Sequence, residues 1–380
     1  MRTRTWAEID LEALAHNFRE VQRLVGAGVG VLAVVKADAY GHGAVPCARA
    51  FAALGAAMLG VACAEEATEL RRAGIRTPIL ILSCVLPDEV DEILAADAAV
   101  NVSDLETARA MSAVATGRGA TLAVHLKVDT GMGRQGVWAD QAAATAHAVA
   151  RLPGLRLDGI FTHFASADDP AEVDFTMAQV DDFVAVLREL EASGLAIPLR
   201  HCANSPAILN YPAAYFNLVR PGLMLYGARY CQAAPDGATL RPVMTLKSRV
   251  TLVKAVAPGQ TLSYGRTFTA TRQMRVAVIP AGYADGLDRR LSNRGWALVR
   301  GRRVPIVGRV CMDQTLLDVT DVPEVMTGDE VVLYGEQSGQ RIPIEEVAAL
   351  LETVPNEVMC AVSRRVPRIY VGGQAPPGDG

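Results

Sequence analysis

The feature that most constrains this chain is a regular alternation of short apolar runs and longer amphipathic stretches between residue 10 and about residue 230. Apolar runs of this kind indicate strands of a parallel sheet that is covered on both faces. Eight strand-and-helix units in this length favour a closed (β/α)8 barrel of the TIM type over an open doubly wound sheet. The expected strands are 31–35, 58–62, 78–82, 98–102, 122–128, 157–164, 199–202 and 217–225.

Helical patterns separate these runs. Asp10 is placed to cap a helix in which Leu11, Leu14, Phe18 and Val21 follow a 3.6-residue period. Residues 64–73, 104–115 and 172–193 show the same kind of pattern, and Gly194 ends the last of them.

The pattern changes after about residue 240. Strand-like runs at 244–256, 274–280, 296–300, 304–311 and 330–334 follow one another with Gly and Pro turns, and residues 344–353 alone look helical. We therefore expect an α/β barrel at 10–238, a mostly-β domain formed by 1–9 and 239–371, and a disordered tail at 372–380.

Composition narrows the class of function. The net charge is −4 with both signs interspersed, which argues against a nucleic-acid surface. The seven cysteines are odd in number and scattered, and the six histidines show no metal-ligand spacing. The chain start lacks an apolar targeting segment, and the uncharged stretch 50–64 is too short to span a membrane. A cytoplasmic enzyme without a metal, a membrane anchor or a nucleic-acid partner is expected.

Lys36 closes the first apolar run and precedes a loop punctuated by glycines. A lysine at the carboxyl end of a buried strand suits an amine that is desolvated in order to act as a nucleophile or base. The alternative is a lysine whose stem covers the core while its ammonium group reaches water.

Other polar residues gather at the carboxyl ends of the later strands, where barrel enzymes place their active sites. A chance gathering at one rim is much less expected than any single instance. The residues are Tyr40, Lys127, Asp129, Arg134, His163, His201, Asn204, Ser205, Arg220, Gly222 and Tyr226.

Seven blocks, in order, give the chain a specific resemblance: 35–43 (VKADAYGHG), 127–134 (KVDTGMGR), 201–205 (HCANS), 219–223 (VRPGL), 262–265 (LSYG), 282–286 (GYADG) and 308–313 (GRVCMD). From about Thr5 to Tyr370 the chain resembles the alanine racemases, enzymes that use pyridoxal 5'-phosphate. The resemblance implies an N-terminal barrel, a C-terminal β domain, a homodimer with shared active sites, and interconversion of L- and D-alanine in D-alanine biosynthesis.

The resemblance also implies roles for single residues. Lys36 would bond the cofactor aldehyde and serve as one base, and Tyr264 of the partner subunit would serve as the second base on the opposite face. Both groups need a pKa tuned below the ordinary value for this work. Arg220 would face the pyridine nitrogen of the cofactor and keep that ring a weak electron sink.

Further residues are implied as binding or supporting groups. His163 would support Arg220, and Arg134 with the backbone N–H of Met312 would hold the substrate carboxylate. Lys127 matches a position that is often carbamylated in the family. The implied phosphate cradle is Tyr40, Ser205 and Gly222, and the implied supporting residues in the second domain are Tyr283 and Asp313.

One position departs from the family pattern. Asn356 stands where the family usually has a tyrosine that narrows the pocket and touches the phosphate. The smaller amide leaves room and can bond a hydroxyl group, so we expect enhanced racemisation of serine beside alanine. The alternative is a neutral substitution in a loop.

Three other functions remain open at this point. A barrel-type decarboxylase of basic amino acids also uses pyridoxal phosphate, but Arg220 is a poor partner for decarboxylation. A non-catalytic cofactor-binding protein would not need the second domain or Tyr264. A Schiff-base aldolase would show no cofactor absorbance.

Overall fold

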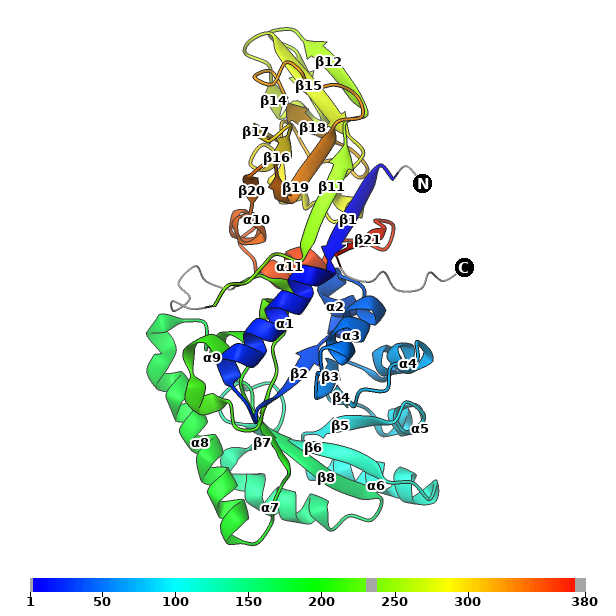
Figure 1. Ribbon diagram of the computed structural model, residues 1–380, viewed down its shortest axis with the longest axis vertical. Coiled ribbons are helices and arrows are strands. Elements are labelled where there is room, and N and C mark those ends of the chain that lie inside the picture. The colour runs from blue at the N-terminus through cyan, green and yellow to red at the C-terminus, as the bar shows by residue number, and fades with distance from the viewer. Residues whose placement is uncertain (1–2, 230–237, 373–380) are drawn as a thin grey trace.

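The computed structural model describes residues 3–229 and 238–372. Eight parallel strands form a nearly closed barrel in the order β10-β2-β3-β4-β5-β6-β8-β9, with helices packed around it (Figure 1). At the seam between β9 and β10, Asn217 Oδ1 accepts a hydrogen bond of 2.8 Å from the backbone N–H of Arg200. The barrel strands are β2 (Gly30–Val34), β3 (Met58–Val61), β4 (Ile79–Ile81), β5 (Ala98–Val102), β6 (Leu122–Asp129), β8 (Leu155–Phe161), β9 (Leu199–His201) and β10 (Leu218–Val219). The predicted barrel is confirmed.

Four helices, α1, α4, α6 and α8, lie at the predicted helical stretches. Asp10 caps α1, where its Oδ1 accepts hydrogen bonds of 2.9 Å from the backbone N–H groups of Glu12 and Ala13. The helices of the barrel region are α1 (Leu11–Val25), α2 (Lys36–Gly41), α3 (Ala44–Ala53), α4 (Ala64–Arg72), α5 (Val90–Ala95), α6 (Leu105–Gly117), α7 (Ala139–Ala150), α8 (Val173–Ala192) and α9 (Ser205–Asn210).

The second domain is mostly β, as predicted, and lies at the other end of the long axis (Figure 1). Its largest sheet has the order β17-β16-β19-β11-β1-β21, and a three-stranded sheet has the order β12-β15-β18. β1 (Thr5–Asp10) pairs with both β11 and β21, so the first and last described strands lie side by side. The other elements are β11 (Met244–Arg249), β12 (Leu252–Val256), β15 (Met274–Ile279), β16 (Trp296–Val299), β17 (Arg302–Pro305), β18 (Thr315–Asp318), β19 (Glu330–Gln337), α10 (Ile344–Leu350), α11 (Pro355–Cys360) and β21 (Arg368–Val371).

Four predicted elements differ in the structure. The expected strand 244–256 is two strands, β11 and β12, which belong to different sheets. The expected strand 217–225 pairs only at Leu218–Val219, and a 3-10 turn at Leu223–Tyr226 follows because Pro221 has no N–H for a ladder. The expected strand 304–311 ends at Pro305 for the same reason. Residues 355–360, expected to be a loop, form α11, which Pro355 begins at a position that tolerates proline.

The barrel and the second domain share one continuous hydrophobic core cluster, which extends from the barrel strands into the sheet around β11 and β19. No helix among residues 3–229 and 238–372 is long and apolar enough to cross a membrane. The predicted disordered tail lies, from residue 373 onward, outside the described residues.

Candidate active site

A cavity of about 550 Å³ opens at the carboxyl ends of the barrel strands. Strands, and the turns that follow them, bring together side chains that are far apart in the sequence, as expected for this face of a barrel. Of the residues predicted from the sequence, those lining the cavity are Lys36, Tyr40, Lys127, Arg134, His163, Asn204, Ser205, Arg220, Gly222 and Asn356.

Lys36 enters the cavity from the end of β2. Burial, and secondly the charge of Arg134, lower the pKa of its amine. The next four residues, 37–40, have φ between 52° and 54°, a left-handed turn that is unfavourable for L-residues. Contacts hold this turn, including a hydrogen bond of 2.7 Å from the Ala37 N–H to Glu66 Oε1. The turn after β2 therefore gives the amine a fixed place in the cavity.

Ser205, Gly222 and Tyr40 form a tight polar corner of the cavity. Ser205 Oγ accepts hydrogen bonds from the backbone N–H groups of Gly222 at 2.9 Å and Met224 at 3.3 Å. A Cβ atom on Gly222 would lie 2.5 Å from the Tyr40 hydroxyl, so only glycine permits this approach. Hydroxyl groups and backbone N–H groups so close together are suited to an anionic oxygen.

Arg220 lies beneath this corner and is 4% exposed. Its Nη2 donates to the carbonyl oxygens of Thr162 at 2.8 Å and Cys202 at 3.1 Å, and lies 3.2 Å from His163 Nδ1. Burial lowers the pKa of Arg220 to about 10, so the group still carries its charge at neutral pH. His163 contacts Arg220 as predicted.

Lys127 is also buried within the barrel, at 1% exposure, and its Nζ donates to the Val128 carbonyl oxygen at 2.8 Å. Burial, with the charge of Arg220 as the next cause, lowers the pKa of Lys127 to about 7. The lowered pKa favours the neutral form of this amine, which nucleophilic reactivity requires. The neighbouring Asp129 carboxylate accepts backbone hydrogen bonds from Gly131 and Arg134, which shapes the loop that carries Arg134.

Of the residues predicted in the second domain, Asn356 lines this cavity, whereas Tyr264, Met312 and Tyr283 do not. Tyr264 is 71% exposed, Met312 is 52% exposed and Tyr283 is 44% exposed. All three side chains are large and lie at the surface of the second domain. The structure thus brings together the barrel half of the predicted site and leaves the second-domain half at the surface.

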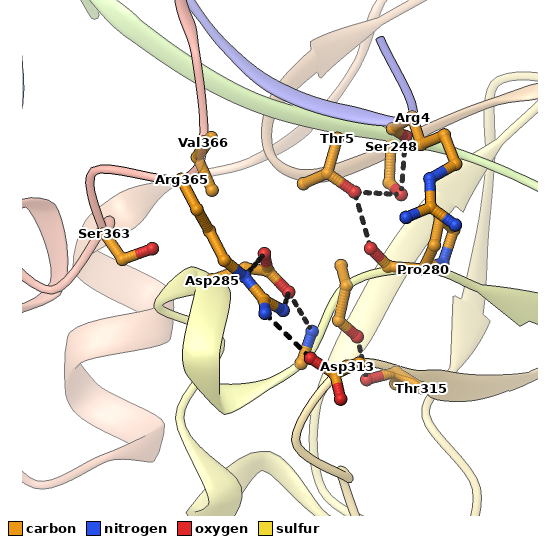
Figure 2. A network of polar contacts seen from close by, with 12 residues as sticks. Arg4, Thr5, Ser248, Pro280, Asp285, Asp313, Thr315, Ser363, Arg365 and Val366 are labelled. Atoms are coloured by element: carbon orange, nitrogen blue, oxygen red, sulfur yellow. Dashed lines mark hydrogen bonds and ion pairs between the residues drawn. The ribbon is translucent and has the colours of Figure 1, made fainter.

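A polar network holds the second-domain loops (Figure 2). Arg365 donates to both carboxylate oxygens of the buried Asp285, at 2.7 and 2.8 Å, and its Nη1 lies 2.8 Å from Asp313 Oδ1. Asp285 Oδ2 also accepts a hydrogen bond of 2.8 Å from the Gly282 N–H. Beside it, the Tyr283 N–H donates to the Cys311 carbonyl oxygen at 3.0 Å. The loops that carry Tyr283 and Met312 are therefore one rigid unit.

Three further residues, which are not among those predicted from the sequence, shape the site. The Phe161 ring lies under both Lys127 and Arg220, at 5.6 and 5.3 Å from its centroid, and Cys360 lines the cavity from α11. His125 is fully buried and contacts His201 inside the barrel. Strand parity could have found His125, because it lies two residues before Lys127 and must point to the same face.

Comparisons with known proteins agree with this geometry. Residues 9–230 match the family described as "Alanine racemase, N-terminal domain", and residues 243–370 match "Alanine racemase, C-terminal domain". A protein of Desulforamulus reducens named alanine racemase is 47% identical over 374 residues, 98% of this chain and 100% of its own length. One of Desulfovibrio desulfuricans, also named alanine racemase, is 46% identical over 96% of this chain and 98% of its own length.

Solved structures give the same result. The alanine racemase of Clostridium difficile 630 superposes with a TM-score of 0.93 at 35% identity, covering 98% of this chain and 97% of that chain. The enzyme from D-cycloserine-producing Streptomyces lavendulae superposes with a TM-score of 0.91 at 38% identity, covering 98% of both chains.

Proposed function

This chain belongs to the alanine racemase family and interconverts L-alanine and D-alanine, and we propose that it does so with pyridoxal 5'-phosphate and two bases on opposite faces of the substrate. The observation that carries the proposal is the partly buried Lys36 amine, whose pKa is lowered in the same cavity as Arg220 and Ser205. This family membership excludes the decarboxylase, carrier and aldolase alternatives as the principal function.

The residues present fit the cofactor. Ser205, Tyr40 and backbone N–H groups around Gly222 would hold its phosphate, because the two hydroxyl groups and Gly222 form the tight polar corner of the cavity. Arg220 would face its ring nitrogen, and Lys36 would bond its aldehyde. When bound, pyridoxal phosphate supplies an aldehyde for the substrate amine and an electron-withdrawing ring that acidifies the α-hydrogen.

The protein's own groups would then divide the work. Arg134 would bind the substrate carboxylate by paired hydrogen bonds. The Lys36 amine would take or return the α-proton from one face, and the hydroxyl of Tyr264 of the partner subunit would do so from the other. Walls formed by Phe161 and the strand ends would exclude water and keep the proton on these two groups.

We further propose a homodimer in which the second domain of one subunit completes the barrel cavity of the other. Its support is the exposure of Tyr264, Met312 and Tyr283, the last two of which lie on loops that the Arg365 network connects. Asp313 would fix the loop whose Met312 N–H reaches the substrate carboxylate.

The dimer is tested by co-expressing Lys36→Ala and Tyr264→Phe subunits with different affinity tags. In a mixed dimer, the Tyr264→Phe barrel would receive the intact tyrosine of the Lys36→Ala subunit, which makes one complete site. Random pairing should restore about a quarter of wild-type activity. Each variant alone, as the control, stays inactive; a mixture equally inactive would refute shared sites.

Two finer proposals concern single residues. We propose that Lys127 is carbamylated, since its pKa of about 7 leaves a neutral amine and a carbamate would offset the charge of Arg134. The intact mass of wild type should exceed the mass calculated from the sequence by one carbon dioxide. A Lys127→Arg variant should lack this increment.

We also propose that Asn356, which borders the cavity from α11, permits racemisation of serine beside alanine. Added room changes discrimination by only about 1–3 kcal/mol, so alanine still reacts. The ratio of kcat/KM for L-serine to that for L-alanine should fall at least about tenfold in Asn356→Tyr; an unchanged ratio contradicts the proposal.

D-alanine biosynthesis in the cytoplasm is the setting that we propose for the enzyme.

A further inference from the structure

Arg220 is a buried cation that is surrounded by neutral groups. Its hydrogen-bond partners are two backbone carbonyl oxygens and one ring nitrogen each of His163 and His201, the last at 2.9 Å from Nη1 to Nδ1. Among residues 3–229 and 238–372, no carboxylate lies within ion-pair distance of this guanidinium group. Its full charge is therefore available to the cavity, provided that the histidines accept its hydrogens.

The hydrogen bonds behind Arg220 can run in one direction only. A guanidinium group donates and never accepts, so His201 Nδ1 must present its lone pair and the proton of that ring must lie on Nε2. His201 Nε2 lies 2.9 Å from His125 Nδ1, which must then accept. His125 in turn carries its own proton on Nε2, and the tautomers of both rings are fixed.

Burial keeps both rings neutral. Each has no solvent exposure, and desolvation lowers the pKa of His125 to about 4 and that of His201 well below its ordinary value. A proton added to His125 Nδ1 would face the Nε2 hydrogen of His201. The chain of hydrogen bonds thus persists throughout the neutral pH range.

The position of the His125 ring in the barrel favours its hydrogen bond with His201. The ring lies over Gly159 of the neighbouring β8, where a Cβ atom would come within 2.3 Å of His125 Nδ1. His125 Nε2 has no hydrogen-bond partner among the described residues, and the residue borders a second cavity, of about 610 Å³, where the barrel strands begin. The single polar contact that the structure gives this buried ring is therefore the one toward His201 and Arg220.

We propose that His125 is a positioning residue for Arg220: by accepting the Nε2 hydrogen of His201, it holds His201 in the one tautomer that can accept from the guanidinium group. A carboxylate in the place of His201 would bind Arg220 more strongly but would cancel its charge. The neutral histidine pair orients Arg220 and leaves its charge directed at the cofactor ring, so the proposal rests on the function proposed above.

The tautomers are tested directly by long-range ¹H–¹⁵N NMR on histidine-labelled holoenzyme, with the cofactor-free protein measured in parallel. Single variants of His125 and His201 assign the signals. Both rings should show a protonated Nε2 and an unprotonated Nδ1, with or without cofactor. A protonated Nδ1 on either ring in the wild-type protein overturns the proposal.

The positioning role is tested by two variants of equal size, His125→Asn and His125→Leu. The Asn Oδ1 atom occupies the place of His Nδ1 and can accept from His201, whereas Leu cannot. We expect His125→Leu to lower kcat about 10- to 100-fold with little change in KM, and to shift the visible absorbance of the bound cofactor. His125→Asn should restore both to within about threefold of wild type.

A third variant, Gly159→Ala, displaces the ring without removing it and should reproduce the His125→Leu absorbance. Equal behaviour of the Asn and Leu variants, or loss of activity in His125→Leu with unchanged absorbance and unchanged His201 signals, refutes the positioning role. These outcomes do not test the proposed function itself. That function is refuted only if the wild-type holoenzyme does not racemise alanine.

Discussion

Basic side chains in the barrel cavity and in the second domain differ in whether they pair with carboxylates. In the cavity, Lys36, Lys127 and Arg220 are basic side chains without an ion-paired carboxylate among the described residues, and burial lowers the pKa of each. In the second domain, arginines pair with carboxylates, as Arg300 does with Asp329 at 2.7 Å. Unpaired buried charge is unfavourable for folding. Its concentration in one cavity therefore marks the place where reactivity is maintained at the expense of stability.

The same two regions also differ in completeness. The cavity residues are held by hydrogen bonds within their own chain, whereas Tyr264 stands 71% exposed on the second domain. In the proposed dimer, the second-domain half completes the cavity of the partner subunit. Variants of cavity residues and of second-domain residues test this difference between the two regions.

Replacing Lys36 should have the largest effect. Lys36→Ala should lower kcat/KM by at least on the order of 10⁴-fold, because both the covalent link and one base are lost. The urea stability of the cofactor-free protein should stay equal or rise, since a partly buried amine is removed. Lys36→Arg is the matched control: it keeps a cation that does not become neutral and should be equally inactive. Activity in Lys36→Arg would contradict the need for a neutral amine.

Acid should destabilise the barrel before the second domain. All six histidines precede residue 202. His42 and His125 are fully buried with pKa values near 4, below the value of about 6.5 in an unfolded chain. As the pH falls from 6.5 to 4, these two histidines bind protons in the unfolded chain but stay neutral in the folded barrel. Each of these histidines then removes about 3 kcal/mol of stability that is fully present above pH 6.5.

Hydrogen exchange with mass spectrometry at pH 7 and pH 4.5 measures this difference. Peptides from the barrel strands should lose protection at pH 4.5, whereas peptides from β11 and β19 should retain it until carboxylates such as Asp329, whose pKa is lowered by Arg300, begin to protonate. His125→Asn should weaken the pH dependence of the barrel. Equal loss in both domains would mean that they unfold as one cooperative unit.

The fold was predictable where the pattern was long and periodic. Seven of the eight barrel strands lie within the predicted runs or within two residues of them, because continuous apolar runs leave little choice for a sheet covered on both faces. The last strand was misjudged: residues 220–225 are as apolar as a strand, but Pro221 and Gly222 direct the chain into a 3-10 turn. α11 escaped notice because six residues are too few to show helical periodicity.

The site was predictable as a set of positions, and less so as geometry. Rim residues such as Lys36 and Arg220 were found because strand ends converge in any barrel. The left-handed turn at 37–40 was not, since its alanines and Asp38 carry no signal for positive φ. His125 was missed because a histidine inside a strand resembles an ordinary core residue, and only three-dimensional contact reveals its link to His201.

In the second domain, breaking the Arg365 network should have an intermediate effect. Asp285→Asn removes the charge that pairs with Arg365, and should lower the free energy of unfolding by about 2 kcal/mol in urea titrations. Because this network fixes the loop of Met312, KM for alanine should rise more than kcat falls. A changed kcat with an unchanged KM would separate Met312 from substrate binding.

The smallest effect is expected at a pair that is exposed on both sides. Arg272 and Asp321 lie 3.3 Å apart, with side chains 56% and 77% exposed, so water and salt screen their attraction. Asp321→Asn should change the free energy of unfolding by less than about 0.5 kcal/mol and leave KM unaltered. It is the control for Asp285→Asn, because both remove one carboxylate charge from an arginine of the same domain. If Asp321→Asn destabilised the protein as much as Asp285→Asn, the burial of Asp285 would make no difference to the strength of its ion pair. The contrast between buried and exposed charges would then fail.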